Sequence, residues 1–479
     1  MLYISDMLST VLFWILLTVY VLLLIGTSTV VVLENQQPAK TIAWLIVLIC
    51  LPIAGMIFFY FFGQDVRHKH IVERRGYEGI SEMILAASVP PHGAEVTPEL
   101  QPMARLVERN GGGKPSEGNS LEVIPCGREF LQSLLRDIYS ARKHIHIETY
   151  IISDDAVGRL VRDALVDKAR EGVEVRLLYD DVGCWKTPEA FFEPLSAAGA
   201  QVAAFLPVRF PSLTRRANYR NHRKVCVFDC NIGYVGGMNI AFRYVSRRWG
   251  TWRDMQLRAR GPLVGDLQRG FLQSWFFTTN MLHGGERYLP RNIEPVGSST
   301  AQISVSSPVS HFPTIMYSVV WMAQNARRYL YLQTPYFMPP TPVLSALQSA
   351  ALAGIDVRLM LPEKTDTFWL KWANESYYSD MLRAGVKVYL YRKGFLHTKA
   401  LVMDDTCCQI GTANLDFRSF ENNFETNAVI YDEKVSGIVR DVFLKDMEDC
   451  ARIEREAWES RPLAHRWINS HVRILSPLL

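Results

Sequence analysis

The chain has 479 residues, which is enough for two or three domains, and 48% of its residues are hydrophobic. Its net charge of +4 is mild and decides little about its partners. Its eight cysteines show no C-x-x-C pair and no zinc-ribbon spacing, so we expect reduced thiols rather than a zinc site.

Two segments near the start of the chain, residues 8–33 and 41–62, contain no charged residue. Each is long enough to cross a bilayer, because a hydrocarbon core of about 30 Å needs about 20 apolar residues in a helix. A cleaved signal peptide fits poorly, because the first segment is preceded by Asp6 but by no Lys or Arg, and no A-x-A-like cleavage site follows. Residues 34–40 are too few for anything but a turn, so we expect a two-helix transmembrane hairpin over residues 1–63.

A basic stretch follows the second apolar segment. Its side chains are Arg67, Lys69, Arg74 and Arg75, with His68 and His70 between them. An excess of Lys and Arg beside a membrane span favours the cytoplasmic side. We therefore expect both termini, and the whole chain beyond residue 63, to be cytoplasmic.

Residues 64–120 are expected to be a connector, because they end in the polar, glycine-rich segment 110–120, whose composition is typical of a flexible loop. Strand-like and helix-like segments then alternate along the chain. Residues 144–152 and 173–179 have the pattern of β-strands, and residues 154–171 have the period of a helix. This order is typical of parallel β-α-β units.

The same alternation recurs in the second half of the chain. Residues 328–334 match the pattern of residues 143–149, and residues 355–360 match residues 173–178. Each half then contains an H-x-K-x4-D motif, and an asparagine follows the motif histidine by 17 positions in both copies. The residues are His222, Lys224, Asp229 and Asn239 in the first half and His397, Lys399, Asp404 and Asn414 in the second.

The two motifs are 175 residues apart, which is too far for one unit of a solenoid. The repeat therefore predicts an α/β fold of two similar lobes, residues 121–297 and 298–479, that share one site between them. Residues two apart on a strand point the same way, so the histidine and the lysine of each motif share a face. We conclude that the chain contains an internally duplicated active site.

Two histidines and two lysines are suited to the transfer of a phosphate ester through a covalent intermediate. Histidine titrates near neutral pH, so one imidazole can attack phosphorus while the other donates a proton to the departing alkoxide. The two motif lysines, with Asn239 and Asn414 as phosphate-binding amides, can stabilise negative charge on the non-bridging oxygens. We therefore expect neither a metal nor another cofactor.

Some other patterns leave a second interpretation open. His144, His146 and Glu148 imitate a metal triad, but they lie on a repeated strand whose second copy has two tyrosines and a glutamine, so we expect a scaffold role. Four aromatic residues could line a lipid entrance or belong to the core, namely Tyr150, Tyr336, Trp369 and Trp372. Residues 458–479 could lie on a membrane surface or pack against the lobes.

The two motifs, together with residues 236–239 and 411–414, resemble those of the phospholipase D superfamily. The resemblance is closest to bacterial cardiolipin synthases and covers essentially the whole chain. Other stretches typical of that family are residues 43–44, 52, 61–63, 334–337, 415–420, 423–427 and 476–479. The resemblance implies two phospholipase D-like lobes, each a mixed sheet flanked by helices, behind a multi-pass anchor in the bacterial inner membrane.

The resemblance also implies roles for individual residues. His222 would be the nucleophile and His397 the acid and later the base, although the two motifs are too similar for the sequence itself to rank them. In the family, a downstream carboxylate holds the second nitrogen of the imidazole. Glu425 lies 28 residues past His397, and Asp254 lies 32 residues past His222, so both are candidates for this role. Ser419 is a further candidate to assist in the second half.

The aspartates of the motifs need separate treatment. Asp229 and Asp404 belong to the H-x-K-x4-D pattern, but they lie past the reach of the strand toward the substrate. We expect them to form buried structural pairs rather than to take part in the chemistry.

The family resemblance implies a cardiolipin synthase, which joins two phosphatidylglycerol molecules of the membrane and releases glycerol through a phosphohistidine intermediate. Arginines near the first motif fit anionic lipid headgroups; they include Arg215, Arg216, Arg220, Arg223, Arg243, Arg247, Arg248, Arg253, Arg258 and Arg260. Phosphatidylethanolamine or another alcohol could also serve as the acceptor. We expect no nucleic-acid partner, and the sequence does not indicate an oligomeric state.

Three other functions remain open at this point. A phospholipase D-type hydrolase would use the same residues with water as the acceptor, and the exclusion of water cannot be read from a sequence. A nuclease of the same superfamily is compatible with the basic side chains, but two membrane spans argue against it. A non-catalytic membrane scaffold would usually have lost part of the catalytic set, which is intact here.

Overall fold

The computed structural model describes residues 2–34, 38–59, 94–208, 219–246, 251–290 and 292–476. The basic stretch from Arg67 to Arg75 lies outside these residues, as do residues 61–63 and 477–479 and the arginines Arg215, Arg216, Arg247 and Arg248. The chain divides into two compact units. The N-terminal unit contains residues 1–75 and 209–217, and the α/β unit contains residues 76–208 and 218–479.

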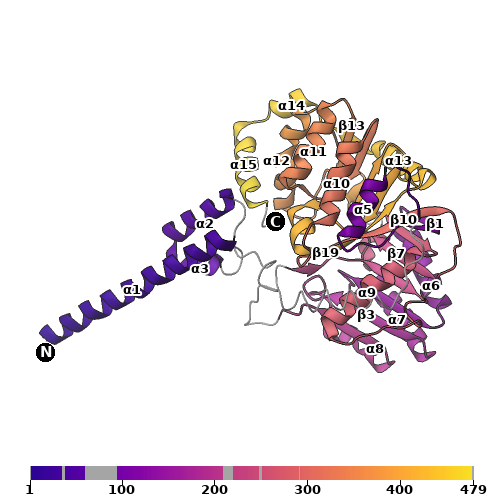
Figure 1. The fold of residues 1–479 in the computed structure, drawn as a ribbon, viewed down its shortest axis with the longest axis horizontal. Helices are drawn as coiled ribbons and strands as arrows, with labels where there is room; N and C mark the ends of the chain where they lie inside the picture. The colour runs from indigo at the N-terminus through magenta and orange to yellow at the C-terminus, as the bar shows by residue number, and fades with distance from the viewer. Residues whose placement is uncertain are drawn as a thin grey trace. The chain divides into compact units, whose positions relative to one another are not determined.

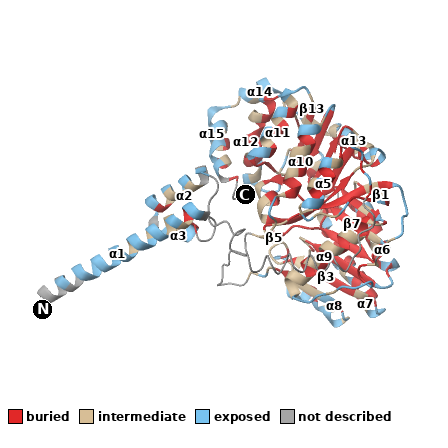
Figure 2. Ribbon diagram, viewed as in Figure 1, coloured by how far each residue is buried: buried red, intermediate tan, exposed pale blue. Residues whose placement is uncertain are grey.

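The first predicted span lies in a single long helix of the N-terminal unit, α1 (Leu2–Glu34). Within it, residues Thr10–Leu33 have a mean hydropathy of 2.5, which makes this helix long and apolar enough to cross a membrane. Most of its side chains are exposed (Figure 2). Exposed apolar side chains along most of a helix are what a lipid-facing helix requires.

The second apolar segment does not form one continuous helix. It is divided into α2 (Pro38–Cys50) and α3 (Pro52–Phe58), because Pro52 lacks an N–H and restricts Leu51 before it. Gly55 allows α3 to approach α2 closely, since a Cβ there would lie 2.9 Å from the carbonyl oxygen of Val47. Within the described ranges, α1 is thus the one helix that could span a membrane by itself, and the expected two-helix hairpin is not confirmed.

The α/β unit is built on one mixed sheet of 16 strands. One of them, β5 (Arg220–Asn221), pairs with β19 off the main path. The others lie in the order β20 (Cys450–Arg452), β14 (Lys387–Tyr391), β13 (Asp356–Pro362), β11 (Tyr329–Gln333), β16 (Ala400–Met403), β17 (Cys407–Gly411), β19 (Asn423–Ile430), β10 (Ser299–Ser306), β1 (Ser116–Ile124), β9 (Gln256–Arg260), β7 (Ile232–Gly236), β6 (Val225–Phe228), β2 (His144–Thr149), β3 (Glu174–Asp180) and β4 (Gln201–Phe205).

The two halves of this sheet repeat the same pairing. In the first lobe β2, β3 and β4 are parallel, whereas β2, β6, β7 and β9 are antiparallel in turn. In the second lobe β11, β13 and β14 are parallel, whereas β11, β16, β17 and β19 are antiparallel in turn. The antiparallel strands β1 and β10 join the lobes in the middle. The α/β fold with a mixed sheet and two similar lobes is therefore confirmed.

Helices cover both faces of the sheet (Figure 1). The alternation of side chains on β6 shows why, since Val225 and Val227 pack in the cluster with α9 while Cys226 and Phe228 pack in the cluster with α6 and α7. In the second lobe α13 takes the place of α9. The principal helices are α5 (Gln101–Arg109), α6 (Gly127–Ser140), α7 (Ala156–Arg170), α8 (Glu193–Ala197), α9 (Leu263–Thr279), α10 (Thr314–Asn325), α11 (Thr341–Leu352), α12 (Phe368–Arg383), α13 (Glu433–Met447), α14 (Arg455–Glu459) and α15 (Leu463–Leu475).

We expected the glycine-rich segment 110–120 to be a flexible loop. This expectation is wrong in part, because β1 begins at Ser116. Gly118 has a φ of +80°, which glycine tolerates, and the pairing with β10 shifts register between Ser116 and Asn119. The buried side chain of Asn119 donates to the carbonyl oxygens of Ser116 at 2.8 Å and Ser299 at 3.2 Å. The composition reflects an irregular strand at the junction of the lobes rather than mobility.

Candidate active site

Each motif histidine is positioned by a short parallel pairing with the opposite lobe. β5 pairs with the start of β19, so that Asn221 lies opposite Phe424. In the same way β15 (Gly394–Leu396) pairs with β8 (Thr251–Arg253), so that Leu396 lies opposite Arg253. The next position of each pairing holds a histidine and a carboxylate, namely His222 with Glu425 and His397 with Asp254.

These histidines and carboxylates are bonded across the lobes. Nδ1 of His222 lies 2.9 and 3.1 Å from the carboxylate oxygens of Glu425, and Nδ1 of His397 lies 2.6 Å from Oδ2 of Asp254. Each imidazole is thus held by a carboxylate, but the pairing suggested by the spacing along the chain is wrong, because each carboxylate contacts the histidine of the other lobe. In the part of the chain that the structure describes, Nε2 of neither histidine is hydrogen-bonded, so it is the nitrogen left for a substrate.

Glu425 lies in a polar environment although it is fully buried. Besides His222, it accepts hydrogen bonds from Oγ1 of Thr412 at 2.5 Å and from Nδ2 of Asn423 at 3.2 Å. Burial alone would raise the pKa of Glu425, but the charges of His222 and Lys224 and these hydrogen bonds hold it below its usual value. Glu425 is therefore ionised at neutral pH.

Asp254 has fewer donors around it. It accepts the N–H of Met255 at 2.7 Å, and burial raises its pKa to about 7. Gly237 packs directly against it, since a Cβ at that position would lie 2.1 Å from Oδ1 of Asp254. Burial thus favours a proton on the pair of His397 and Asp254, whereas Glu425 stays ionised.

Both motif lysines are buried beside their own histidines. Nζ of Lys224 donates to the carbonyl oxygen of His222 at 2.6 Å. Nζ of Lys399 donates to the carbonyl oxygen of His397 and lies 2.9 Å from its Nδ1. Burial lowers the pKa of Lys224 to about 7 and that of Lys399 to about 8. An anionic ligand would restore their full charge, because a nearby negative charge favours the ammonium form.

The two motifs lie within electrostatic reach of each other. Burial lowers the pKa of His222 to about 4, and the charge of Lys399 from the opposite lobe adds to this decrease. Burial likewise lowers the pKa of His397 well below its ordinary value, with contributions from Lys399, Lys224 and His222. The histidines of the two lobes therefore form one shared site, in which neutral imidazole is the favoured form.

The two predicted phosphate-binding asparagines are buried, and both are bonded to their own lobes. Oδ1 of Asn239 accepts the N–H of Ile151 at 3.0 Å, and its Nδ2 donates to the hydroxyl of Tyr244 at 2.8 Å. Nδ2 of Asn414 donates to Oδ2 of Asp416 at 3.2 Å, and its Oδ1 has no partner among the residues that the structure describes. Phosphate binding by these amides stays a prediction.

Ser419 has a structural position next to Asn414. Its fully buried Oγ accepts the N–H of Asn414 at 3.1 Å, and its own N–H donates to Oδ1 of Asp416 at 2.7 Å. These contacts shape the turn that carries Asn414, and no reacting group of the site is among them.

The motif aspartates lie at the far ends of β6 and β16 from the histidines. The carboxylate of Asp229 accepts three backbone N–H groups from residues 142–144, and that of Asp404 accepts three from residues 327–329, all at 2.6–2.8 Å. Both aspartates also have positive φ angles, 53° and 54°, in the turns that follow these strands. They anchor the starts of β2 and β11, so the expected buried pairs are in fact carboxylate contacts with backbone amides.

Comparisons with known proteins follow the same division of the chain. The family described as "Cardiolipin synthase, PLD-like domain" matches residues 134–255 and 319–447, and the family "Phospholipase_D-nuclease N-terminal" matches residues 12–64. A cardiolipin synthase of Geobacillus kaustophilus is 39% identical over 464 residues, covering 94% of this chain and 91% of that protein. Cardiolipin synthase 2 of Bacillus anthracis is 40% identical over 466 residues, covering 94% and 89%. The major cardiolipin synthase of Bacillus subtilis is 37% identical over 479 residues, covering 97% and 99%.

The chain belongs to the cardiolipin synthase family. As a member of this family it is a phosphatidyltransferase. Among solved structures, the phosphatidylserine synthase of Haemophilus influenzae has a TM-score of 0.57 and 14% identity, covering 75% of this chain and 95% of that one. At this identity the likeness concerns the fold alone.

Two carboxylates hold the segment before His222 in this cardiolipin synthase family member. Oδ2 of Asp180 accepts the N–H of Asn221 at 2.9 Å, and Oδ1 lies 3.5 Å from Arg220. Glu148 accepts from Nδ2 of Asn221 at 2.6 Å. The sequence interpretation placed Glu148 in the scaffold and missed Asp180. Their positions near the carboxyl ends of the parallel strands β2 and β3, where α/β sheets hold ligands, could have indicated both.

The two histidines next to Glu148 on β2 belong to a separate buried cluster. Nδ1 of His146 lies 3.0 Å from Oε1 of Gln268 on α9, and its Nε2 lies 2.9 Å from Nη1 of Arg176. His144 stacks near His146, with ring centroids 4.6 Å apart. Among the described residues no group of three His, Cys, Asp or Glu side chains is arranged to hold a metal ion.

Aromatic rings surround the two motif histidines unequally. The ring of Tyr150 lies 4.9 Å from that of His222. The rings around His397 are those of Trp252 at 5.1 Å, Tyr244 at 5.8 Å and Phe395 at 5.8 Å. Of the four aromatic residues considered for a lipid entrance, Tyr150 thus borders the site, and Tyr336 lies one ring further out, 6.4 Å from Phe395.

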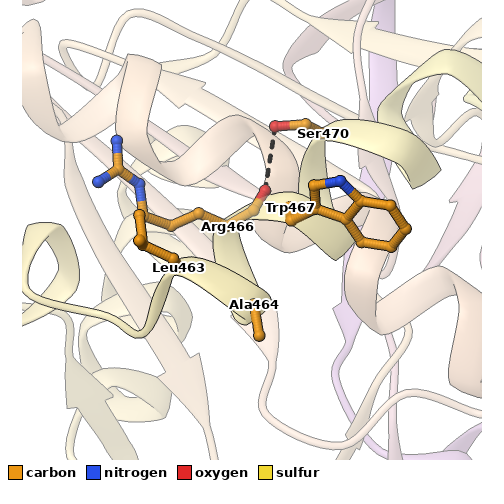
Figure 3. A pocket seen from close by; sticks show the side chains of 5 residues that line it. All are labelled: Leu463, Ala464, Arg466, Trp467 and Ser470. Carbon is orange, nitrogen blue, oxygen red and sulfur yellow. Dashed lines mark hydrogen bonds between the residues drawn. The ribbon is translucent and has the colours of Figure 1, made fainter.

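Trp369 and Trp372 lie instead on α12, where α15 packs. Nδ2 of Asn469 donates to the carbonyl oxygen of Trp372 at 3.2 Å, so the C-terminal segment does pack against the second lobe. The opposite side of α15 is exposed and bears a hollow of about 530 Å³. Its lining residues are Leu463, Ala464, Arg466, Trp467 and Ser470 (Figure 3). None of them belongs to the repeated motifs.

Proposed function

We propose that this chain synthesises cardiolipin from two phosphatidylglycerol molecules and releases glycerol. The observation that carries this proposal is the pair of histidine–carboxylate contacts, one across each lobe boundary, which are flanked by two buried lysines. Burial raises the pKa of Asp254, whereas that of Glu425 is held below its usual value. The lobes that supply them are residues 121–297 and 298–479. A site with one deprotonated and one protonated pair has both the nucleophile and the acid that such a transfer needs.

In the first step His222 attacks the phosphorus of one phosphatidylglycerol. Its Nδ1–H donates to ionised Glu425, which leaves the Nε2 lone pair free for attack. The bond from phosphorus to the glycerol oxygen breaks as the bond from Nε2 to phosphorus forms. The departing glycerol oxygen takes up the proton that His397 and Asp254 share.

In the second step the headgroup hydroxyl of another phosphatidylglycerol attacks the phosphohistidine. His397, now deprotonated, accepts the proton of this hydroxyl as the new oxygen–phosphorus bond forms. The bond between phosphorus and Nε2 of His222 breaks, which regenerates both pairs. Two displacements at one phosphorus predict net retention of configuration.

The buried lysines serve the phosphate during both steps. Lys224 and Lys399 lie beside the two imidazoles and have lowered pKa values in the free site. A bound phosphodiester restores their charge, so they stabilise the additional negative charge of the transition state. The amide groups of Asn239 and Asn414 would bind the phosphate oxygens once they exchange their present hydrogen-bond partners for them. This scheme requires no metal and no other cofactor.

We also propose that residues 8–33 and 41–62 form an anchor with two passes through the inner membrane, with the α/β unit on the cytoplasmic side. The match of residues 12–64 to a separate N-terminal family and the lack of charge in both segments support this topology. Protease added to inverted membrane vesicles should digest the α/β unit, whereas protease added to intact spheroplasts should not. Digestion in spheroplasts would contradict the orientation.

Product analysis tests the reaction directly. The full-length protein, reconstituted in vesicles of phosphatidylglycerol labelled in the headgroup, should place half of the consumed label in cardiolipin and half in free glycerol. A hydrolase would release all of the consumed label as glycerol and would leave phosphatidic acid. Phosphatidic acid as the main product would therefore refute the proposed transfer.

A further inference from the structure

The internal repeat extends beyond the asparagines. Phenylalanine and arginine follow Asn239 by three and four positions, as Phe242 and Arg243, and a second phenylalanine and arginine follow Asn414 at the same distances. The second arginine is Arg418, so the two arginines are separated by the same 175 positions as the two histidines. A pair of repeated cations next to the catalytic set suggests that both copies have a place in the site.

Arg243 lies beside the acid–base histidine. Its guanidinium is 4.4 Å from the ring centre of Trp252, whose ring is 5.1 Å from that of His397. It is also 5.9 Å from the ring of Tyr244, whose hydroxyl lies 3.4 Å from Nδ1 of His397. Arg243 therefore stacks on the same two aromatic side chains that border His397, although it comes from the other lobe.

Arg243 has no partner of opposite charge in the part of the chain that the structure describes. Its Nε is buried without a hydrogen-bond partner among the described residues. A partly buried guanidinium without a counterion is unfavourable unless an anion completes it. The planar guanidinium offers two parallel N–H donors, which suits a phosphodiester.

Arg418 is the counterpart of Arg243 in the repeat. It begins η5 (Arg418–Asn422), and its charge acts on Tyr150, the ring that lies 4.9 Å from His222. Its charge also acts on the carboxylate of Asp416, two positions before it in the chain. Because Arg418 is the repeat counterpart of Arg243 and its charge acts on the ring beside His222, it is a matched control for Arg243.

The transfer of a phosphatidyl group between lipids involves two phosphodiesters. One is the reacting phosphate, which the two lysines surround. The other belongs to the lipid that supplies the attacking hydroxyl, and the glycerol headgroup places only three carbons between that hydroxyl and its own phosphate. Because His397 must contact the hydroxyl, this second phosphate comes to lie on the His397 side of the site.

We propose that Arg243 binds the phosphodiester of the acceptor lipid while the headgroup hydroxyl of that lipid lies at His397. The inference rests on the proposed transfer function. It gives the site a preference for an anionic lipid over water or a neutral alcohol, because only the anionic acceptor neutralises Arg243. During the step, the hydroxyl proton moves to Nε2 of His397, the oxygen bonds to phosphorus, and the bond from phosphorus to His222 breaks.

Two reactions of the full-length protein in phosphatidylglycerol vesicles separate this role from a general one. Cardiolipin formation needs an acceptor with a phosphate, whereas exchange of labelled free glycerol into phosphatidylglycerol uses an acceptor without one. Arg243→Gln should slow cardiolipin formation about 30- to 100-fold but glycerol exchange less than about threefold, because it removes one charge-assisted contact to the acceptor. Arg243→Lys should give an intermediate loss of cardiolipin formation, since lysine keeps the positive charge but lacks the two parallel N–H donors of the guanidinium.

Arg418→Gln is the control, and it should change both reactions by the same factor. A parallel loss of both reactions in Arg243→Gln and Arg243→Lys, or no loss in either, would overturn the proposal. A selective loss of cardiolipin formation in Arg418→Gln would overturn it as well, because the acceptor would then enter beside His222. Phosphatidic acid as the main product of the unaltered protein would refute the transfer function itself, before any variant is compared.

Discussion

The two lobes contain the same motif in the same strand pattern, yet they surround it differently. His222 is held by Glu425, which receives three side-chain donors and is ionised, whereas His397 is held by Asp254, whose pKa is raised to about 7. The amide nitrogen of Asn239 is bonded to a tyrosine, but that of Asn414 is bonded to an aspartate. The repeat is symmetric in its motif and asymmetric in the surroundings that set protonation.

This difference supports the proposed division of roles, which the motifs alone leave open. A nucleophile needs a free lone pair, which the deprotonated pair of His222 and Glu425 provides. An acid needs a proton, and the raised pKa of Asp254 favours one on the pair of His397 and Asp254. In the proposed mechanism the two halves therefore differ through their carboxylates, each of which comes from the lobe opposite to its histidine.

The largest expected effect is the loss of either histidine. His222→Ala and His397→Ala should each lower cardiolipin formation by about 10,000-fold or more, because either change removes a required step. A lipid with a nitrophenol headgroup distinguishes the two, since nitrophenolate leaves without a proton. His397→Ala should release a burst of nitrophenol from this lipid, and His222→Ala should release none.

The opposite pattern would exchange the roles of the two histidines. A burst in His222→Ala with none in His397→Ala would contradict the assignment made from the carboxylates. Both variants should retain the unfolding temperature of the parent protein within a few degrees, which the thermal unfolding of the purified proteins checks.

Substitution of the carboxylates should have a smaller and unequal effect. Glu425→Gln should reduce turnover by about 1,000-fold, because the neutral amide no longer supports the tautomer in which His222 is the nucleophile. Asp254→Asn should reduce turnover by about 100-fold. The loss is smaller because the raised pKa of Asp254 already favours its neutral form, which asparagine resembles. Steady-state rates of cardiolipin formation measure both. A larger loss in Asp254→Asn than in Glu425→Gln would mean that the two pairs do not differ as described.

The pH dependence should report the same difference. Below about pH 4 the pair around His222 gains a proton, so kcat/KM falls as the pH decreases through this value. Above about pH 7 to 8 the shared proton of Asp254 and the charges of Lys224 and Lys399 are lost, so kcat/KM falls again. A bell-shaped profile over pH 3.5–9.5 is therefore expected, with limbs of about tenfold per pH unit or steeper. A flat profile up to pH 9 would contradict the protonated state of His397 and Asp254.

The smallest effect is expected for the motif aspartates. Asp229→Asn and Asp404→Asn should change turnover by less than about threefold, because these side chains hold the starts of strands and asparagine tolerates their left-handed backbone. Replacement by alanine should lower the free energy of unfolding by about 1–3 kcal/mol, since backbone N–H groups lose their acceptor. Thermal unfolding and activity are measured together. A loss of activity without a loss of stability would give these aspartates a part in the chemistry.

The sequence predicted the lobes and the histidine–lysine motifs because a duplicated pattern is visible without knowledge of contacts. It could not predict that Glu425 pairs with His222, since strand pairing between distant segments decides this and spacing along the chain does not. The glycine-rich segment around Gly118 was misread because composition does not distinguish a bulged strand from a loop. The break at Pro52 could have been predicted, because a proline inside an apolar segment restricts the residue before it.

The repeat itself contained a further signal that the sequence interpretation did not use. Alignment of the chain with itself beyond Asn239 and Asn414 would have matched Arg243 with Arg418. The proximity of Arg243 to His397, however, depends on the packing of Trp252, which only the structure shows.

The central claim is that His222 forms the covalent bond to phosphorus. The full-length protein should be mixed with vesicles of phosphatidylglycerol labelled at phosphorus, quenched in alkali within milliseconds, digested and mapped for labelled phosphohistidine. The label is predicted on the peptide that contains His222. Label on the peptide of His397, or its absence from both while cardiolipin is being formed, would contradict the account.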